Sequence, residues 1–267
     1  MAVYVGTSGF KFADWKEAFY PAGVPEKSWL NYYATVFGCL EVNSTYYRPL
    51  PPATFAQMAA KVPAGFQFTV KAYQSITHQS DTDNAADFAT FVESLNPLVE
   101  AGKLGGVLAQ FPNSFRPTPA TCDYLARLRE RLAGLPVAVE FRHRDWARKE
   151  TFPLLCRLDL AYCAVDEPQF SSLMPPLSVA TSALGYVRFH GRNYQTWWQG
   201  DSKRRYDYLY SRPELEEWVP RIVRLDDETG KVFVFMNNCF GAQAAKNAVD
   251  IRDLLKERLA PRPSPSP

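Results

Sequence analysis

The stretch that decides the fold is Val139-Glu140-Phe141-Arg142-His143-Arg144-Asp145-Trp146, which follows the apolar pair Val137-Ala138. The apolar lead-in predicts a β-strand that ends in charged residues. Side chains alternate between the two faces of a strand, so Glu140 and Arg142 share one face. His143 then lies on the other face or on the turn that follows. If the shared face points into a barrel, a buried carboxylate has its counter-ion two residues away.

Short apolar runs of the same kind recur along the chain, and most of them precede a helical pattern. Including the one just described, the predicted strands are residues 3–6, 39–42, 66–70, 105–109, 137–140, 161–165, 186–189 and 232–235. Eight strand–helix units in a chain of 267 residues are typical of a (β/α)8 TIM barrel. An open doubly wound sheet is less favoured, because the first turn, Gly6-Thr7-Ser8-Gly9-Phe10, does not match G-x-G-x-x-G.

The helical patterns lie between these strands. They cover residues 25–37, 54–61, 85–100, 119–132, 151–158, 213–225 and 242–259. Thr118 and Pro119 suit the N-cap and first position of their helix. Residues 168–181 contain three prolines and are predicted to form a loop. With no internal repeat or linker, we expect one TIM-barrel domain over residues 1–259 and a disordered, proline- and serine-rich tail over 260–267.

The composition gives no sign of a membrane or a bulk polyanion as partner. Thirty basic and twenty-eight acidic residues leave a formal charge of +2, so any electrostatic specialisation has to be local. We see neither a signal peptide nor an apolar run of about 18 residues, the length that spans a membrane. The five cysteines form no C-x-x-C motif and are predicted to be reduced thiols. These features favour a cytoplasmic protein.

Polar side chains follow every predicted strand, where barrel enzymes place their chemistry. Strand alternation predicts that many of them share the inner face. Residues of the same parity are Glu41 and Asn43, Thr69 and Lys71, Glu140 and Arg142, Ala164 and Asp166, Arg188 and His190, and Phe235 and Asn237. Gln110 also ends a strand. The opposite parity is largely apolar. A polar mouth at the carboxyl ends of the strands is therefore predicted, although strand ends also become polar simply by meeting solvent.

Three carboxylates, those of Glu41, Glu140 and Asp166, lie on the predicted inner face. Two carboxylates whose environments separate their pKa values can act as a general acid and a general base. His190 could carry a proton beside them. The alternative is an ion-pair network, with Glu140 paired to Arg142 and Glu41 paired to Lys71 or Arg188.

The basic residues at the predicted mouth are Lys71, Arg142, Arg188 and Arg192. Guanidinium groups form paired hydrogen bonds with carboxylate and phosphate oxygens. The predicted ligand is therefore anionic, with the amides of Asn43, Gln110 and Asn237 orienting it.

The three histidines, His78, His143 and His190, each follow a predicted strand. A zinc or manganese site built from them and carboxylates is left open, but no H-x-H, H-E-x-x-H or C-x-x-C spacing supports one. The sequence therefore assigns no metal and no cofactor.

Residues 190–210 form a long segment that mixes aromatic and basic residues and includes Trp197. Such a mixture can stack on bases or sugars and hold phosphates. Alternatively, the segment is a lid whose aromatic rings pack on the barrel rim.

Over nearly its whole length the chain resembles the family called domain of unknown function 72. The motifs that carry the resemblance are Gly6-Thr7-Ser8-Gly9-Phe10, Asp14-Trp15-Lys16, Phe19-Tyr20-Pro21, Glu41-Val42-Asn43-Ser44-Thr45-Tyr46-Tyr47, Phe68-Thr69-Val70-Lys71, Ile76-Thr77-His78, Gln110-Phe111-Pro112, Val139-Glu140-Phe141-Arg142-His143 with Trp146, Val187-Arg188-Phe189-His190-Gly191-Arg192 and Phe235-Met236-Asn237-Asn238. Asn113 replaces a usual proline, and Met236 a usual aromatic residue. The resemblance implies a TIM barrel and no particular reaction. The likeness of that fold to metal-dependent endonuclease barrels suggests nucleic acid as a ligand, by analogy alone.

The main functional hypothesis is a hydrolase-type enzyme that acts on a phosphate-bearing or otherwise anionic substrate. The alternative is a non-catalytic protein that binds nucleic acid through residues 190–210. A glycosidase is less favoured, because the fourth and seventh strands do not end in the paired carboxylates of many barrel glycosidases.

Overall fold

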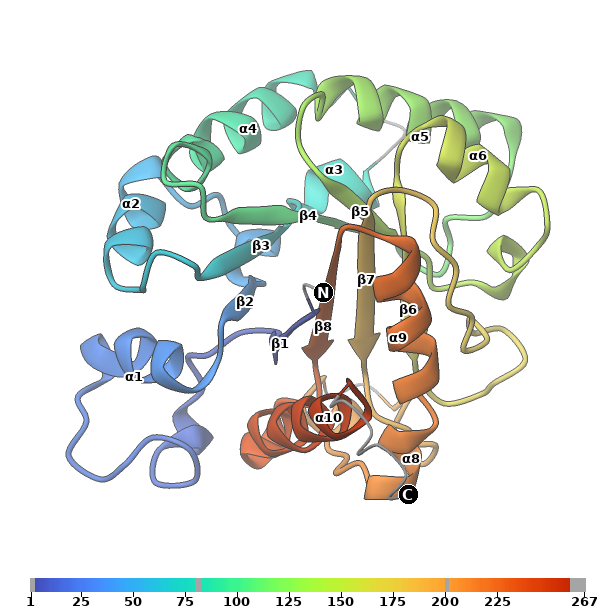
Figure 1. Ribbon diagram of the computed structural model, residues 1–267. Coiled ribbons are helices and arrows are strands. Elements are labelled where there is room, and N and C mark those ends of the chain that lie inside the picture. Colours follow the sequence, from blue (N-terminus) through green and yellow to red (C-terminus); the bar gives the residue numbers. More distant parts are fainter. Residues whose placement is uncertain (1–2, 80–82, 200–201, 260–267) are drawn as a thin grey trace, which may run out of the picture.

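The computed structural model describes residues 3–79, 83–199 and 202–259. Its centre is a barrel of eight parallel strands (Figure 1). The strands are β1 (Val3–Thr7), β2 (Cys39–Val42), β3 (Gln67–Lys71), β4 (Leu104–Gln110), β5 (Val137–Glu140), β6 (Ala161–Asp166), β7 (Leu184–Phe189) and β8 (Lys231–Met236). Each neighbours its successor in the chain, and β8 pairs with β1. The predicted (β/α)8 TIM barrel is confirmed.

The barrel closes between β1 and β2 with few backbone hydrogen bonds. Ser8 and Glu41 form an isolated bridge, and the Gly9 amide donates to the Glu41 carbonyl over 2.9 Å. Further down, a side chain lies between the strands. The Tyr33 hydroxyl accepts a hydrogen bond from the Thr7 amide over 2.9 Å and donates one to the Cys39 carbonyl over 3.0 Å. Helix α1 thus supplies a bridging group where direct pairing stops.

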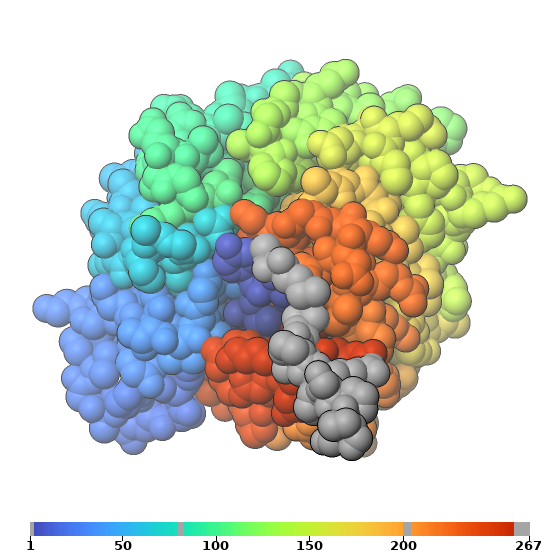
Figure 2. All heavy atoms as spheres, in the orientation of Figure 1, coloured from blue at the N-terminus to red at the C-terminus, as the bar shows by residue number. Residues whose placement is uncertain are grey.

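Helices surround the barrel in chain order. They are α1 (Trp29–Val36), α2 (Pro52–Ala60), α3 (Gln74–His78), α4 (Ala85–Glu100), α5 (Pro119–Arg131), α6 (Thr151–Arg157), α7 (Ser202–Arg205), α8 (Arg212–Glu216), α9 (Val219–Glu228) and α10 (Gln243–Leu259). Short 3-10 helices cover Ala13–Trp15, Glu26–Ser28, Ser44–Tyr46, Arg144–Trp146 and Phe240–Ala242. In Figure 2 the coloured segments follow one another around the molecule, from blue through green and yellow to red.

The helical segments differ from prediction in three places. The expected helix over 213–225 is two helices, because Pro220 stands in the first turn of α9 and cannot donate a backbone hydrogen bond to the turn before it. The short helices α3 and α7 were not predicted. The loop predicted over 168–181 is present, so β6 and β7 are joined without a helix.

Local capping fixes several of these helices. Thr118 accepts a hydrogen bond from the Thr121 amide and forms a capping box at the start of α5, as predicted.

Within the described part of the chain, no helix is both long and apolar enough to cross a membrane. The predicted disordered tail over 260–267 lies outside the described residues.

Candidate functional site

The centre of the barrel mouth is the guanidinium group of Arg188, near the end of β7. Its Nη2 lies 2.6 Å from Glu41 Oε1, its Nε lies 3.0 Å from Glu41 Oε2, and its Nη1 lies 2.6 Å from Glu140 Oε2. All three side chains are buried. Nη2 also donates to the Ser8 hydroxyl. These four hydrogen bonds engage every nitrogen of Arg188 and leave one N–H, on Nη1, without a partner among the described residues. Arg188 therefore ties β7 to β2 and β5, and its substrate-binding role stays a prediction.

Glu140 is the second hub of this network. Besides Arg188 it forms an ion pair with Arg142, whose Nε lies 2.7 Å from Oε1, and it accepts a hydrogen bond from His190 Nε2 at 3.1 Å. Burial raises the pKa of Glu140, but Arg142 and Arg188 outweigh burial and hold the pKa well below its usual range. The group is therefore an ionised acceptor at neutral pH. A permanently ionised carboxylate with two strong partners is poorly suited to the acid role considered for it.

His190, also fully buried, is held by both ring nitrogens. Nε2 faces Glu140, and Nδ1 lies 3.0 Å from Asn237 Nδ2. Burial and the nearby Arg142 lower the pKa of His190 to about 3, against the pull of Glu140. The ring is neutral near pH 7, with Nε2 donating to Glu140 and Nδ1 accepting from the Asn237 amide. Both positions through which it could carry a proton are occupied.

Glu41 completes the network with the Tyr186 hydroxyl, which donates to its Oε2 over 2.6 Å. The ion-pair arrangement raised as the alternative is thus the one present, with Arg188 as the partner of Glu41. Catalytic roles for Glu41, Glu140 and His190 stay predictions. Their geometry is that of a rigid, charge-compensated floor beneath the mouth.

Asp166 and Arg192 lie outside this network, and the inner-face position predicted for Asp166 is wrong. Its carboxylate accepts hydrogen bonds from Trp218 Nε1 at 2.6 Å, Tyr210 Oη at 2.6 Å and Arg192 Nη2 at 2.7 Å. These partners belong to the connection between β7 and β8. On β6 it is Cys163 that faces the barrel interior, with its Sγ 3.9 Å from Glu140 Oε2.

Glu167, directly after β6, is a site residue that the sequence reading missed. Its Oε2 accepts from Arg142 Nη1 at 3.2 Å, and its Oε1 accepts from the Met174 amide at 3.1 Å. Burial raises the pKa of Glu167 to about 7, although Arg142 opposes the shift. The sequence signal that could have found Glu167 is its position. It directly follows Asp166, so its side chain points to the opposite face of the strand.

Lys71, at the end of β3, is the basic residue of the mouth that pairs with no carboxylate among the described residues. Its Nζ donates to Gln110 Oε1 over 2.8 Å and lies 4.3 Å from the centre of the Tyr46 ring. Burial and the like charges of Arg188 and Arg142 lower the pKa of Lys71 to about 7. Near neutral pH the amine is therefore divided between its protonated and neutral forms.

A hollow of about 230 Å³, here called the rim pocket, opens beside Lys71 and Gln110. It is lined by His78, Gln110, Pro112, Asn113, Arg142, Leu173, Trp197, Trp198, Arg205 and Tyr206. No acidic residue is among these described lining residues. Arg205 stacks over the Trp197 ring at 5.6 Å, and its buried Nε makes no hydrogen bond to a described residue. The rim pocket thus combines guanidinium and amide donors with aromatic walls.

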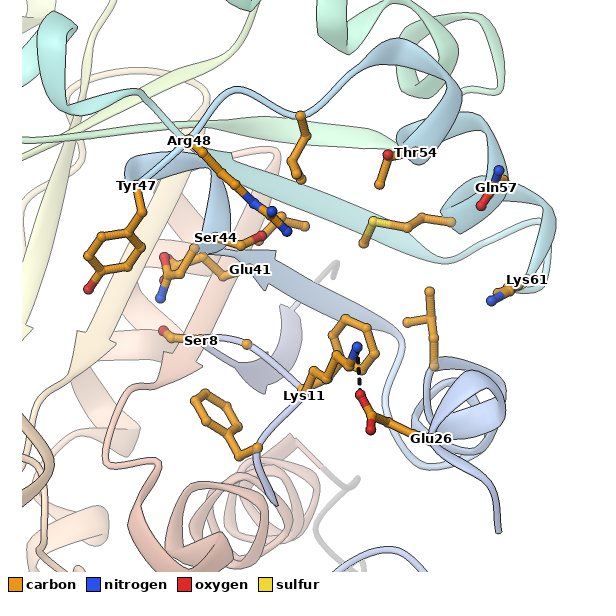
Figure 3. Close-up of a pocket in the computed structure, with 18 of the residues that line it drawn as sticks. Ser8, Lys11, Glu26, Glu41, Ser44, Tyr47, Arg48, Thr54, Gln57 and Lys61 are labelled. Carbon is orange, nitrogen blue, oxygen red and sulfur yellow. Dashed lines mark ion pairs between the residues drawn. The ribbon is translucent and has the colours of Figure 1, made fainter. Parts of the chain in front are cut away.

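Two more hollows adjoin the mouth. The central hollow, about 240 Å³, is lined by Ser8, Phe12, Asp14, Asn43, Tyr47, Tyr206, Asn237, Cys239 and Phe240. The outer groove, about 540 Å³, lies between the segments that follow β1 and β2 (Figure 3). Ser8, Glu41 and Asn43 are among its lining residues. The predicted substrate-orienting amides of Asn43, Asn237 and Gln110 therefore all line hollows at the mouth.

A larger hollow of about 850 Å³ lies at the opposite end of the barrel, near the strand starts Gly105, Val137 and Lys231. None of the predicted site residues lines it.

No group of three metal-ligating side chains occurs within the described residues. His143 has a local role, because its Nδ1 accepts a hydrogen bond from the Asp145 amide and caps the 3-10 helix before Trp146.

Comparisons with known proteins match the whole barrel. The profile of the family described as "Protein of unknown function DUF72" matches residues 4–267. The UPF0759 protein YunF of Bacillus subtilis (strain 168) is 31% identical, over 97% of this chain and 98% of its own.

Solved structures agree with these matches. A DUF72 family protein (TM1631) from Thermotoga maritima is 39% identical, with a TM-score of 0.89 over 96% of this chain and 100% of its own. A DUF72 family protein (EF0366) from Enterococcus faecalis is 27% identical, with a TM-score of 0.86 over 99% of this chain and 100% of its own.

Proposed function

The chain belongs to the DUF72 family, whose name carries no activity, and we propose from the site itself that the protein is a hydrolase-type enzyme acting on a phosphate-bearing substrate. The observation that carries the proposal is the rim pocket. It presents Arg205 and Asn113 without a lining carboxylate, at the end of the barrel where enzymes of this fold bind substrates. Arg142, a third donor in its wall, is held in place by Glu140 and Glu167. Charge-assisted hydrogen bonds from such groups favour phosphate oxygens.

Lys71 is the best-placed acid–base group for this substrate. Its amine bonds to Gln110, a residue of the rim pocket wall, and its lowered pKa leaves a large neutral fraction near pH 7. A neutral amine can take a proton from an attacking water molecule. In this proposal the Glu41–Arg188–Glu140 network holds the strand ends in place, and Lys71 replaces the carboxylates as general base.

The binding part of the proposal is tested by calorimetric titration with phenyl phosphate. Arg205→Gln removes a guanidinium group of the rim pocket, and we expect affinity to fall about tenfold, the loss of one charge-assisted hydrogen bond. Arg204→Gln is the matched control, because Arg204 is the exposed neighbour and lines none of the hollows described here. Equal affinities for the two variants, or no binding by the unaltered protein, would refute the rim pocket as a phosphate site.

The catalytic part is tested by the release of nitrophenol from aryl phosphate mono- and diesters. We expect the rate to rise through a pKa near 7, as Lys71 loses its proton. Lys71→Met should abolish turnover, while phenyl phosphate still binds. Unchanged turnover in Lys71→Met would contradict the assignment of the base.

A second candidate function, binding of single-stranded nucleic acid, is favoured by an exposed aromatic cluster beside the rim pocket. Phe170 contacts Tyr194 and Trp198, which are 52% and 54% exposed and free to stack on bases. Trp197 is 2% exposed, so the predicted stacking role does not extend to it. Oligonucleotide affinity that falls steeply with salt and is weakened by Trp198→Ala would support this candidate.

A further inference from the structure

The three hollows at the mouth share lining residues, so they adjoin one another in series. Tyr206 lines both the rim pocket and the central hollow. Ser8, Asn43 and Tyr47 line both the central hollow and the outer groove. The hollows therefore adjoin one another across the barrel mouth, from the segment after β7 to the segments after β1 and β2. We call this series of hollows the mouth cleft.

The size of the cleft exceeds what a phosphate group needs. Pockets that enclose small-molecule ligands usually measure about 300–1,000 Å³. The rim pocket, about 230 Å³, falls below that range, whereas the outer groove, about 540 Å³, lies within it. Most of the space for a ligand is thus on the far side of the mouth from the basic rim pocket.

The outer groove differs in chemistry from the rim pocket. Its apolar lining residues are Phe10, Phe12, Leu30, Val42, Leu50 and Met58. In Figure 3, Ser8 and Tyr47 mark the end next to the barrel, while Gln57 and Lys61 stand at the far end. Lys11 in this groove is already paired with Glu26 at 2.5 Å. Apolar atoms make up most of the lining of the groove, and in Figure 3 Arg48 and the Lys11–Glu26 ion pair also face its interior.

The junction between groove and central hollow carries an unused polar atom. The side chain of Asn43 lines both spaces, and its buried Oδ1 accepts no hydrogen bond from a described residue. A buried acceptor without a partner is costly unless a ligand or water supplies a donor. A ligand that passes from one space to the other would run alongside this amide.

We propose that the substrate is an anionic amphiphile, with a phosphate group in the rim pocket and an apolar chain that crosses the mouth into the outer groove. This inference rests on the proposed phosphate site for the anionic end. The apolar lining of the groove, and the residues it shares with the central hollow, support the position of the apolar chain. In this inference the bond next to the phosphate lies on the side of the rim pocket formed by Gln110, the residue to which Lys71 bonds.

Calorimetric titration with a series of n-alkyl phosphates, from methyl to octyl and below micelle-forming concentrations, tests the inference. Each buried methylene group contributes roughly 0.8 kcal/mol, which corresponds to about fourfold in affinity. We expect affinity to be nearly constant for the shortest chains and then to rise by about two- to fourfold per methylene group as the chain enters the groove.

Met58→Gln replaces an apolar groove residue with a polar one of similar size, and it should flatten the dependence on chain length while methyl phosphate binds as before. Val99→Gln is the control, because Val99 is an exposed apolar residue on α4 that lines none of these hollows. Arg205→Gln should weaken every member of the series by the same factor.

The outcomes separate the two proposals. If no alkyl phosphate binds, both the rim pocket assignment and the amphiphile fail. If phosphates bind without any effect of chain length, the phosphate site stands and the amphiphile is overturned. A chain-length effect that survives Met58→Gln unchanged also overturns the groove as the place where the chain lies.

Discussion

Arg188 is the residue on which the mouth depends most directly. Replacing it by Met leaves the buried carboxylate of Glu41 without its counter-ion and removes one of the two arginines paired with Glu140. Breaking a buried ion pair by removing one partner costs about 3–5 kcal/mol. We expect Arg188→Met to lower the free energy of unfolding by that amount, measured by urea denaturation.

The double variant Arg188→Met/Glu41→Gln tests the cause of this loss. It removes the unpaired charge of Glu41, while Glu140 keeps Arg142, so it should recover part of the lost stability. Arg212→Ala, which breaks only exposed ion pairs, should leave the urea midpoint unchanged. A double variant less stable than Arg188→Met would contradict the account.

Strand alternation places Glu41, Glu140 and Arg188 correctly, because the intervening residues on their strands are apolar. It fails on β6, where Cys163 rather than Asp166 faces the barrel interior. Apart from Asp166, residues of both parities on β6 are hydrophobic, so alternation does not distinguish the inner face from the outer one. The polar residue at the end of the strand was therefore assigned to the wrong face. The groups that donate hydrogen bonds to Asp166 come from residues 26 to 52 positions later, and the sequence does not show that they lie beside it.

At the scale of elements, the join between β1 and β2 depends on a hydroxyl group from α1. Tyr33→Phe removes the acceptor of the Thr7 amide and the donor to the Cys39 carbonyl. Unsatisfied buried polar groups cost about 1–3 kcal/mol. We expect Tyr33→Phe to be destabilised by about that amount and the Thr7 amide to exchange its hydrogen faster.

Tyr32→Phe is the matched control for this prediction, because the Tyr32 hydroxyl bonds to no described residue, although its ring also packs against Phe19 and Tyr20. If both variants lose the same stability, the hydroxyl bridge contributes nothing. The sequence could not predict this bridge. A tyrosine at an apolar helical position looks like ordinary core, and only the barrel geometry brings it between two strands.

Elements and their order could be predicted because hydrophobic periodicity is a local property. The mouth cleft could not, because it depends on how the segments after all eight strands fold over the barrel. Residues such as Arg205 and Asn113 stand well beyond strand ends, where alternation gives no direction. The lowered pKa of Lys71 likewise arises from burial and from Arg188 and Arg142 on other strands.

For the whole molecule, the buried titratable groups predict the pH dependence of stability. The pKa of His190 falls from its ordinary value of 6.5 to about 3, so the unfolded chain binds its proton first, and this contribution to stability is lost as pH falls below about 6.5. The pKa of Glu167 rises from 4.5 to about 7, so the folded chain holds that proton, and stability rises as pH falls from about 7 to 4.5.

These two contributions oppose each other between about pH 4.5 and 6.5, and below that range the depressed pKa of Glu140 adds a further loss. Urea unfolding at pH 5, 6 and 7 separates them. His190→Gln keeps a donor for Glu140 but cannot titrate, so this variant should gain stability relative to the unaltered protein as pH falls from 7 to 5. Glu167→Gln should do the reverse, since the His190 contribution remains together with that of His78, whose pKa burial lowers to about 4. Each proton that only one of the two states binds, folded or unfolded, changes the slope of the unfolding free energy against pH by about 1.4 kcal/mol per pH unit. If stability changes with pH in the same way in all three proteins, neither group changes its protonation on unfolding. The ionisation states that the hydrogen bonds of the buried network indicate would then be wrong.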